Sequence, residues 1–121
     1  VSGCKAKQGE EILKKMFAMD SGASMLGEVA LVPKESPINR SGLLFMNTLF
    51  DENACCHVAV GEGFQEVIEG AENMTLDEIH ALGVNDSIIH VDFMIGSDDL
   101  DITGICEDGT EIPVFRNGTW A

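Results

Sequence analysis

The amino-acid sequence predicts a mixed α/β fold, with a small mixed sheet, about three short helices and a carboxy-terminal β-hairpin. Apolar residues recur at helical spacing between residues 9 and 19. Residues 87–97 are almost entirely apolar, which is typical of a buried strand. The alternating segments 101–106 and 110–115 flank an Asp-Gly pair, which is typical of a hairpin. The 121 residues, 45% of them hydrophobic, suit one domain spanning 1–121.

The first forty residues are predicted to form two helices and a strand. Residues 9–19 carry the helical stripe, and two glutamate–lysine pairs at i, i+4 support that helix. A second short helix is predicted over residues 20–26, because Asp20 or Ser21 can cap its start and a glycine follows its end. Residues 28–33 form an apolar segment that ends in proline and indicates a strand. Residues 34–42 are predicted to be a loop.

The middle of the chain allows two interpretations. Leu43 to Phe45 begins either a strand or a helix. Asp51 resembles a helix cap, which favours a helix over residues 52–60, and a strand over residues 55–60 is the alternative. His57 lies inside this apolar segment. A lone histidine there is more often a hydrogen-bonded core residue than a metal ligand.

A third helix is predicted after a polar loop at residues 62–73. Thr75 and Glu78 have the spacing of a capping box, which opens the helix, and Gly83 ends it. His80 lies near the polar side of this helix and is expected on the surface. The residues expected to face inward are Leu76, Ile79 and Leu82.

Two polar residues interrupt the predicted buried strand. His90 and Asp92 are two positions apart, so on a strand their side chains project from the same face. Burying an imidazole and a carboxylate without partners costs several kcal/mol. Either the two residues form a hydrogen-bonded core pair, or they hold a metal ion together with further ligands.

The composition excludes several classes of partner. The chain has 21 acidic and 7 basic residues, a formal charge of −14, which argues against binding nucleic acid or anionic membranes. No apolar run approaches the ~20 residues of a membrane-spanning helix, and no signal peptide is visible after Val1. The four cysteines form no C-x-x-C motif and are expected to be reduced thiols of a cytoplasmic protein.

Five sequence blocks occur in order along residues 27–121. They are G-E-V-A-L-V-P at 27–33, S-P-I at 36–38, N-T-L-F-D-E-N-A-x-C-H at 47–57, N-D-S-x-I-H-V-D-F-M-I-G-S at 85–97 and D-G-T-x-x-P-V-F-R-N-G at 108–118. Together they resemble the thermophilic aminopeptidase family, which comprises the aminopeptidase T, aminopeptidase S and PepS-type enzymes. The H-V-D-F-M-I-G-S block and the final R-N-G are the most specific parts of this resemblance.

The resemblance implies a metallo-aminopeptidase that removes amino-terminal residues from peptides with a dinuclear centre, usually as a homodimer. It implies two divalent ions, and zinc, cobalt or manganese suit nitrogen and carboxylate donors. Matching the motifs residue by residue assigns the metal-binding set Glu28, Glu52, His57, His90 and Asp92. Glu52 is assigned as a ligand or as an acid/base group beside the ions.

Two departures from the family pattern affect the expected activity. Family members are much longer, so the chain resembles only their carboxy-terminal catalytic portion, with the amino-terminal domain and one further glutamate ligand absent. Their catalytic tyrosine follows the matching histidine by seven residues, where this chain has Phe64 and no tyrosine anywhere. The isolated chain is therefore expected to be a weak or inactive peptidase. The alternatives are a non-catalytic metal-binding or dimerisation domain of the same fold, and a globular domain whose His–Asp pair holds no metal.

Overall fold

The computed structural model describes residues 1–121 and confirms the predicted mixed α/β class. The α-helices are α1 (Glu10–Phe17), α2 (Pro37–Ser41), α3 (Thr48–Asp51) and α4 (Leu76–Ala81). Single 3-10 turns occur at Glu52–Ala54, Gln65–Val67 and Ala71–Asn73. The strands are β1 (Leu26–Ala30), β2 (His57–Gly61), β3 (His90–Met94), β4 (Ile102–Ile105), β5 (Glu111–Arg116) and β6 (Thr119–Trp120). They form two three-stranded sheets, β1-β2-β3 and β4-β5-β6, where one sheet was expected.

The chain folds into two compact units, each made of two stretches of sequence. The first unit contains Val1–Val29 and Val58–Asp92, and the second contains Ala30–His57 and Phe93–Ala121. No helix is both long enough and apolar enough to span a membrane.

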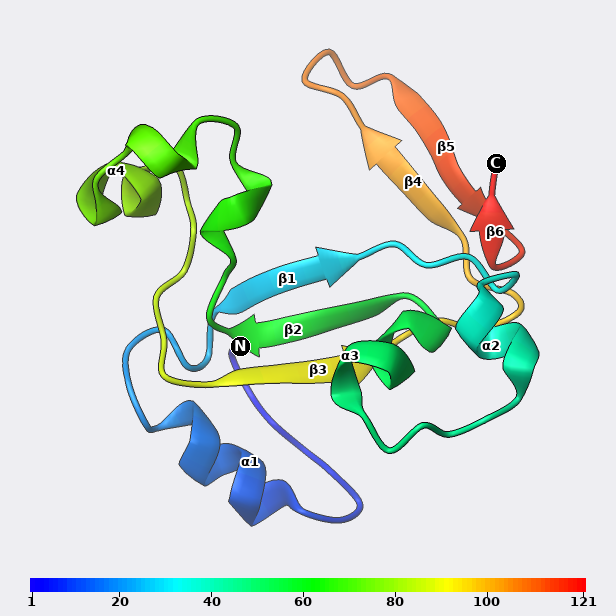
Figure 1. Cartoon of the computed structure of the whole chain (residues 1–121), viewed down its shortest axis with the longest axis horizontal. Coiled ribbons are helices and arrows are strands. Elements are labelled where there is room, and N and C mark those ends of the chain that lie inside the picture. Colours follow the sequence, from blue (N-terminus) through cyan, green and yellow to red (C-terminus); the bar gives the residue numbers. More distant parts are fainter. The chain divides into compact units, whose positions relative to one another are not determined.

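Strand β2 is the central strand of the first sheet, between β1 and β3 (Figure 1). It is also the most buried strand, with Ala59 and Val60 inside the core. Strand β3 is half-buried rather than fully buried as predicted, because it is an edge strand of this sheet. The two isoleucines that flank it, Ile88 and Ile95, are exposed.

The helix predicted over residues 20–26 is wrong. Residues 18–25 form turns and bends, and β1 begins at Leu26. The side chain of Asp20 accepts a hydrogen bond from the main-chain N–H of Gly22, and its other oxygen accepts one from Ile88, 68 residues away. These bonds hold the backbone of this segment in a turn, so a tertiary contact overrides the local helix signal.

The middle of the chain follows the alternative interpretation, a strand. A short α3 and one 3-10 turn end at Ala54, and β2 begins at His57, so the helix predicted over residues 52–60 is wrong. Valine-rich residues 57–61 fit the central strand of a sheet better than a helix. The predicted loop at 34–42 contains α2, whose N-cap Ser36 accepts a hydrogen bond from the N–H of Asn39. Residues 43–45 form neither helix nor strand.

The predictions for α4 hold at its start and fail on its buried face. Thr75 and Glu78 form the predicted capping box, and His80 is exposed as expected. Of the three residues expected to face inward, only Ile79 is buried, while Leu76 and Leu82 are exposed.

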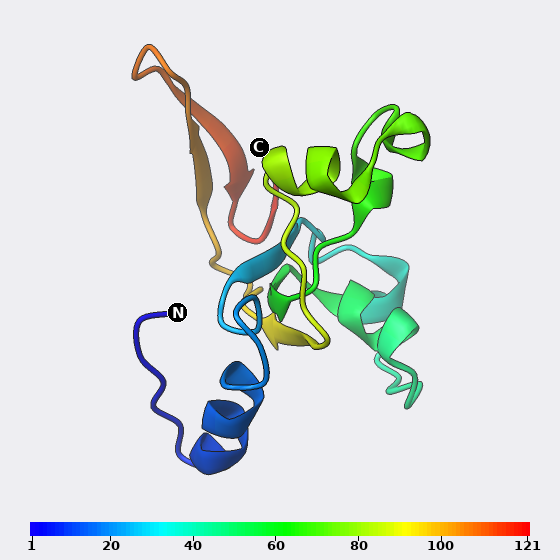
Figure 2. The same ribbon diagram turned by 90° about the vertical axis from the view of Figure 1, so that its left-hand side faces the viewer.

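The predicted carboxy-terminal hairpin is confirmed. Strands β4 and β5 pair antiparallel and form the orange hairpin of Figure 2. Ile105 lies opposite Glu111, next to the Asp-Gly turn. Strand β5 then pairs with β6 through a second turn. The fully buried Phe115 ring packs on the ring of the exposed Trp120, with ring centroids 4.5 Å apart, so Phe115 is the buried residue of the second sheet.

Candidate metal centre

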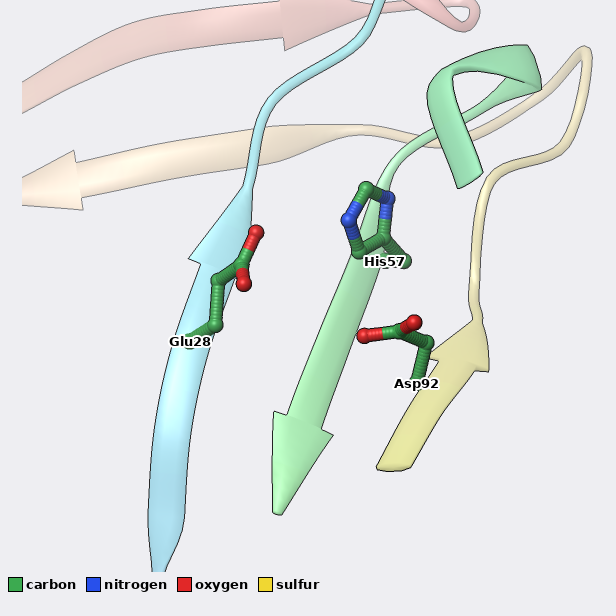
Figure 3. A group of neighbouring side chains, drawn as sticks. All are labelled: Glu28, His57 and Asp92. Carbon is green, nitrogen blue, oxygen red and sulfur yellow. The ribbon is translucent and has the colours of Figure 1, made fainter. Parts of the chain in front are cut away.

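Two carboxylates and one imidazole converge on the β1-β2-β3 sheet. They are Glu28 of β1, His57 of β2 and Asp92 of β3, and one ligand atom from each lies within 4.8 Å of those of the other two. Figure 3 shows the two carboxylates and the imidazole pointing toward one another from neighbouring strands. A zinc-to-ligand bond is about 2.0–2.2 Å long, so two ligands of one ion are at most about 4 Å apart. Small side-chain rotations would therefore bring all three groups onto one ion.

The local sequence explains why Glu28 reaches this position. It follows Gly27, where a Cβ atom would lie only 2.3 Å from the main-chain oxygen of Glu62. Only glycine permits this close approach between β1 and the segment after β2. The side chain of Glu28 is 28% exposed, so its carboxylate remains partly accessible to solvent.

His90 lies beside the same carboxylates, as its two-residue spacing from Asp92 predicts. Its Nε2 atom is 3.1 Å from Oδ1 of Asp92 and 3.3 Å from Oε2 of Glu28. Four of the five residues assigned to the metal-binding set by sequence are thus in this part of the sheet. Glu52, the fifth, begins the 3-10 turn after α3, is half-buried, and does not belong to the group of converging ligand atoms.

Main-chain carbonyl groups orient both histidine rings. Nδ1 of His57 is 3.0 Å from the oxygen of Cys55, and Nδ1 of His90 is 2.8 Å from the oxygen of Glu62. A carbonyl oxygen only accepts hydrogen bonds, so in both rings Nδ1 carries the hydrogen and donates it. In a neutral imidazole Nε2 then has a lone pair, which is the state of a metal-binding histidine. The sequence could not identify these two acceptors.

Oδ1 of Asp92 is the one buried side-chain polar atom without a hydrogen-bond partner. Nε2 of His90 lies 3.1 Å from this oxygen and presents a lone pair whenever that ring is neutral. Two acceptors facing each other at 3.1 Å, beside a second carboxylate, repel unless a positive charge lies between them. A proton on His90 or a divalent cation supplies that charge. The donor set of two carboxylates and two imidazoles fits zinc, cobalt or manganese.

The ring of Phe64 packs against the imidazole of His90. The two ring centroids are 4.8 Å apart, and 47% of Phe64 is exposed. Next to it is an open, largely apolar cavity of about 460 Å³. Its lining includes Glu28, Val29, Phe64, Ile68, Leu82 and Val84. One group of the candidate metal centre therefore borders an apolar cavity.

Comparisons with known proteins place the chain among metallopeptidases. The model of the family described as "Thermophilic metalloprotease (M29)" matches residues 1–120. The chain is 53% identical over 116 residues to aminopeptidase 2 of Geobacillus stearothermophilus, covering 96% of this chain and 28% of that protein. It is 55% identical over 117 residues to aminopeptidase AmpS of Bacillus subtilis, covering 97% and 28% of the two chains.

A solved structure shows the same similarity. Wild-type AmpT from Thermus thermophilus superposes with a TM-score of 0.84 at 47% identity, which covers 99% of this chain and 29% of that one. The chain thus spans a little over a quarter of the length of the relatives that it matches.

Proposed function

Because the chain belongs to the thermophilic metalloprotease (M29) family, as its sequence blocks predict, we propose that it forms the metal-binding part of an aminopeptidase. Such an enzyme removes amino-terminal residues from peptides. The observation that carries this proposal is the convergence of Glu28, His57 and Asp92 on one sheet, with Nε2 of His90 beside them. The names of the relatives support the reaction, and the donor set supports the metal.

We assign four ligands to this centre: Glu28, His57, His90 and Asp92. Glu28 is the candidate for a carboxylate shared between two ions, because it belongs to the group with His57 and also lies 3.3 Å from His90. Zinc, cobalt or manganese ions held there would polarise the scissile carbonyl and activate water. The hydrogen bonds from Nδ1 of both histidines keep Nε2 directed at the carboxylates.

Two further residues are assigned roles in the reaction by family resemblance. Glu52 is proposed as an additional ligand or as the group that carries a proton, and its half-buried side chain suits contact with solvent. Phe64 takes the position of the family's tyrosine and cannot donate a hydrogen bond to a developing oxyanion. Loss of one such donor typically lowers the rate by about 10²–10³-fold. We therefore propose weak catalysis at most for the isolated chain.

The cavity beside Glu28 supports a peptide substrate with an apolar first residue. If the scissile carbonyl of a peptide were held at this centre, the side chain of its first residue would lie next to the four proposed metal ligands. The apolar lining from Val29, Phe64 and Leu82 suits an aliphatic or aromatic side chain. A cavity of about 460 Å³ is large enough for it.

The activity of the whole protein is a wider proposal, because the chain covers 28% of its relatives. We propose that it corresponds to the carboxy-terminal catalytic portion of such an enzyme and that the full-length form is a homodimer, as the family resemblance implies. The second candidate function is a metal-binding or dimerisation domain without catalysis. The replacement of tyrosine by Phe64 favours that alternative.

Thermal melts of the purified chain test the metal centre. We expect zinc, cobalt or manganese to raise the melting temperature above that in EDTA, because an ion that binds only the folded chain stabilises it by mass action. Free ion at 100 times its dissociation constant stabilises the fold by about 2.7 kcal/mol. His90→Ala should abolish the increase, and the matched control His80→Ala, at an exposed position on α4, should retain it. Equal melting temperatures in EDTA and in all three metals would refute the proposal.

A further inference from the structure

Glu62 makes three hydrogen bonds to one segment of the chain, the approach to β3. Its main-chain N–H donates to the oxygen of Ile89 at 2.7 Å. Its carbonyl oxygen accepts from Nδ1 of His90 at 2.8 Å. Its carboxylate accepts from the N–H of Ser87 at 2.6 Å. A single residue directly after β2 thus contacts the first residue of β3 and two residues just before it.

The backbone on either side of Glu62 is held against the same segment. Gly61 has a φ of +98°, and a Cβ atom there would lie 2.0 Å from the oxygen of Ile89, so only glycine fits. The side-chain amide of Asn85 donates to the oxygen of Gly61 at 2.6 Å, and the N–H of Gly63 donates to the oxygen of Asn85 at 2.9 Å. The carbonyl that orients His90 therefore belongs to a bend with little freedom to move.

We propose that Glu62 is a positioning residue for metal binding, which acts through His90. Its carbonyl selects the His90 tautomer with hydrogen on Nδ1 and fixes the ring so that Nε2 faces Glu28 and Asp92. Its carboxylate accepts a hydrogen bond from the N–H of Ser87, three residues before His90, and so holds the segment that leads into β3 beside the Glu62 carbonyl. This inference rests on the proposed metal centre, and it assigns Glu62 no contact with the ion itself.

The side chain of Glu62 matters because it is one of two carboxylates that hold this segment. Asp20 accepts from the hydroxyl of Ser87 at 3.0 Å and from the N–H of Ile88 at 2.9 Å. Removing the Glu62 carboxylate leaves the N–H of Ser87 without its acceptor. The remaining bonds keep the bend against β3, and the loss of this one leaves the His90 ring less firmly oriented. Groups that orient a metal-binding histidine typically contribute about 10–100-fold to metal affinity.

Metal titration of Glu62 variants tests this inference with zinc alone as the probe. Calorimetry on the complete 121-residue chain should show Glu62→Ala binding zinc about 10–100-fold more weakly than the unsubstituted chain. Glu62→Gln should bind nearly as well, because its amide oxygen still accepts from the N–H of Ser87. Glu66→Ala is the matched control for charge, since Glu66 is exposed on the next 3-10 turn, and it should leave the affinity unchanged.

A spectroscopic measurement separates positioning from a general loss of stability. Nitrogen NMR of the histidine rings in EDTA should show His90 with hydrogen on Nδ1 in the unsubstituted chain and in Glu62→Gln. A mixture of tautomers is expected in Glu62→Ala. If Glu62→Ala does not fold, Glu62→Asp, whose carboxylate is one methylene short of Ser87, should show both effects in weaker form.

The outcomes distinguish this inference from the proposed function. Zinc binding by the unsubstituted chain, with equal affinity and an unchanged His90 tautomer in Glu62→Ala, would overturn the positioning role alone. A lower melting temperature of Glu62→Ala in EDTA with an unchanged zinc affinity would do the same. If the unsubstituted chain binds no zinc, the metal centre and this inference fail together.

Discussion

Replacing Asp92 with asparagine should stabilise the metal-free chain and abolish metal binding. The buried Oδ1 of Asp92 has no hydrogen-bond partner and lies 3.1 Å from Nε2 of His90. The asparagine side chain is nearly isosteric with aspartate, and its amide N–H can donate to the Nε2 lone pair. The substitution also removes one of the two carboxylates that converge there, Glu28 being the other.

The expected gain follows from these two changes. A buried polar group without a partner costs about 1–3 kcal/mol, and a new neutral hydrogen bond contributes about 1 kcal/mol. The two terms overlap, because the new hydrogen bond is what satisfies the buried group, so the expected net gain is about 1–3 kcal/mol. For a chain of this length, each kcal/mol shifts the melting temperature by about 4 °C. We expect a rise of roughly 4–12 °C in EDTA.

The assay is a pair of thermal melts, in EDTA and in excess zinc. Zinc should raise the melting temperature of the unsubstituted chain, whereas the Asp92→Asn chain should melt at the same temperature in EDTA and in excess zinc. Asp86→Asn is the matched control, because the same change at an aspartate outside the metal centre should alter stability by less than about 0.5 kcal/mol. If Asp92→Asn melts below the unsubstituted chain in EDTA, Asp92 is the partner of a protonated His90 in a structural ion pair, and the reasoning for a metal is refuted.

Three further predictions concern activity, pH and the capping of α4. The isolated chain with excess cobalt or zinc should hydrolyse a leucine chromogenic amide far below the enzyme median of roughly 10 per second, and EDTA-sensitive turnover near that median would show a complete enzyme. The hydrogen bond from the N–H of Ile88 holds the pKa of Asp20 below its usual value. Asp20 therefore stabilises the fold at pH values above its pKa in the unfolded chain, and this stabilisation is lost as the pH falls through its lower pKa in the folded chain. Urea unfolding should accordingly show Asp20→Asn less stable than the unsubstituted chain at about pH 7, and an equal difference at acid pH would contradict this. Thr75→Ala removes the N-cap of α4 and should cost about 1 kcal/mol, measured as a lower urea midpoint, and an unchanged midpoint would refute this expectation.

The features that were predicted correctly depend on residues close in sequence. The capping box joins Thr75 to Glu78, and the Asp-Gly turn joins two neighbouring strands. The shared face of His90 and Asp92 follows from the period of a strand alone. Family motifs then supplied Glu28 and His57, which no local pattern connects to β3.

The features that were missed depend on contacts between distant segments. Asp20 caps no helix because its carboxylate bonds to a residue 68 positions away. The acceptors that orient the two histidines are main-chain oxygens, of Cys55 and Glu62, and every residue has such an oxygen. Side-chain identity therefore carries no signal for them. Glu62 itself could have been suspected only from its place between two glycines, Gly61 and Gly63.

The three strands that carry the converging ligands are far apart along the chain. Glu28 and His57 are separated by 29 residues, and His57 and Asp92 by 35. An ion bound to all three would close two long loops in the way that a pair of disulfide bridges does, and closing loops of this size restricts mainly the unfolded chain. The ion would also have to leave before β1, β2 and β3 could separate. Unfolding in the presence of metal should therefore be limited by dissociation of the ion, and chelator concentration should set how quickly this sheet loses protection against hydrogen exchange.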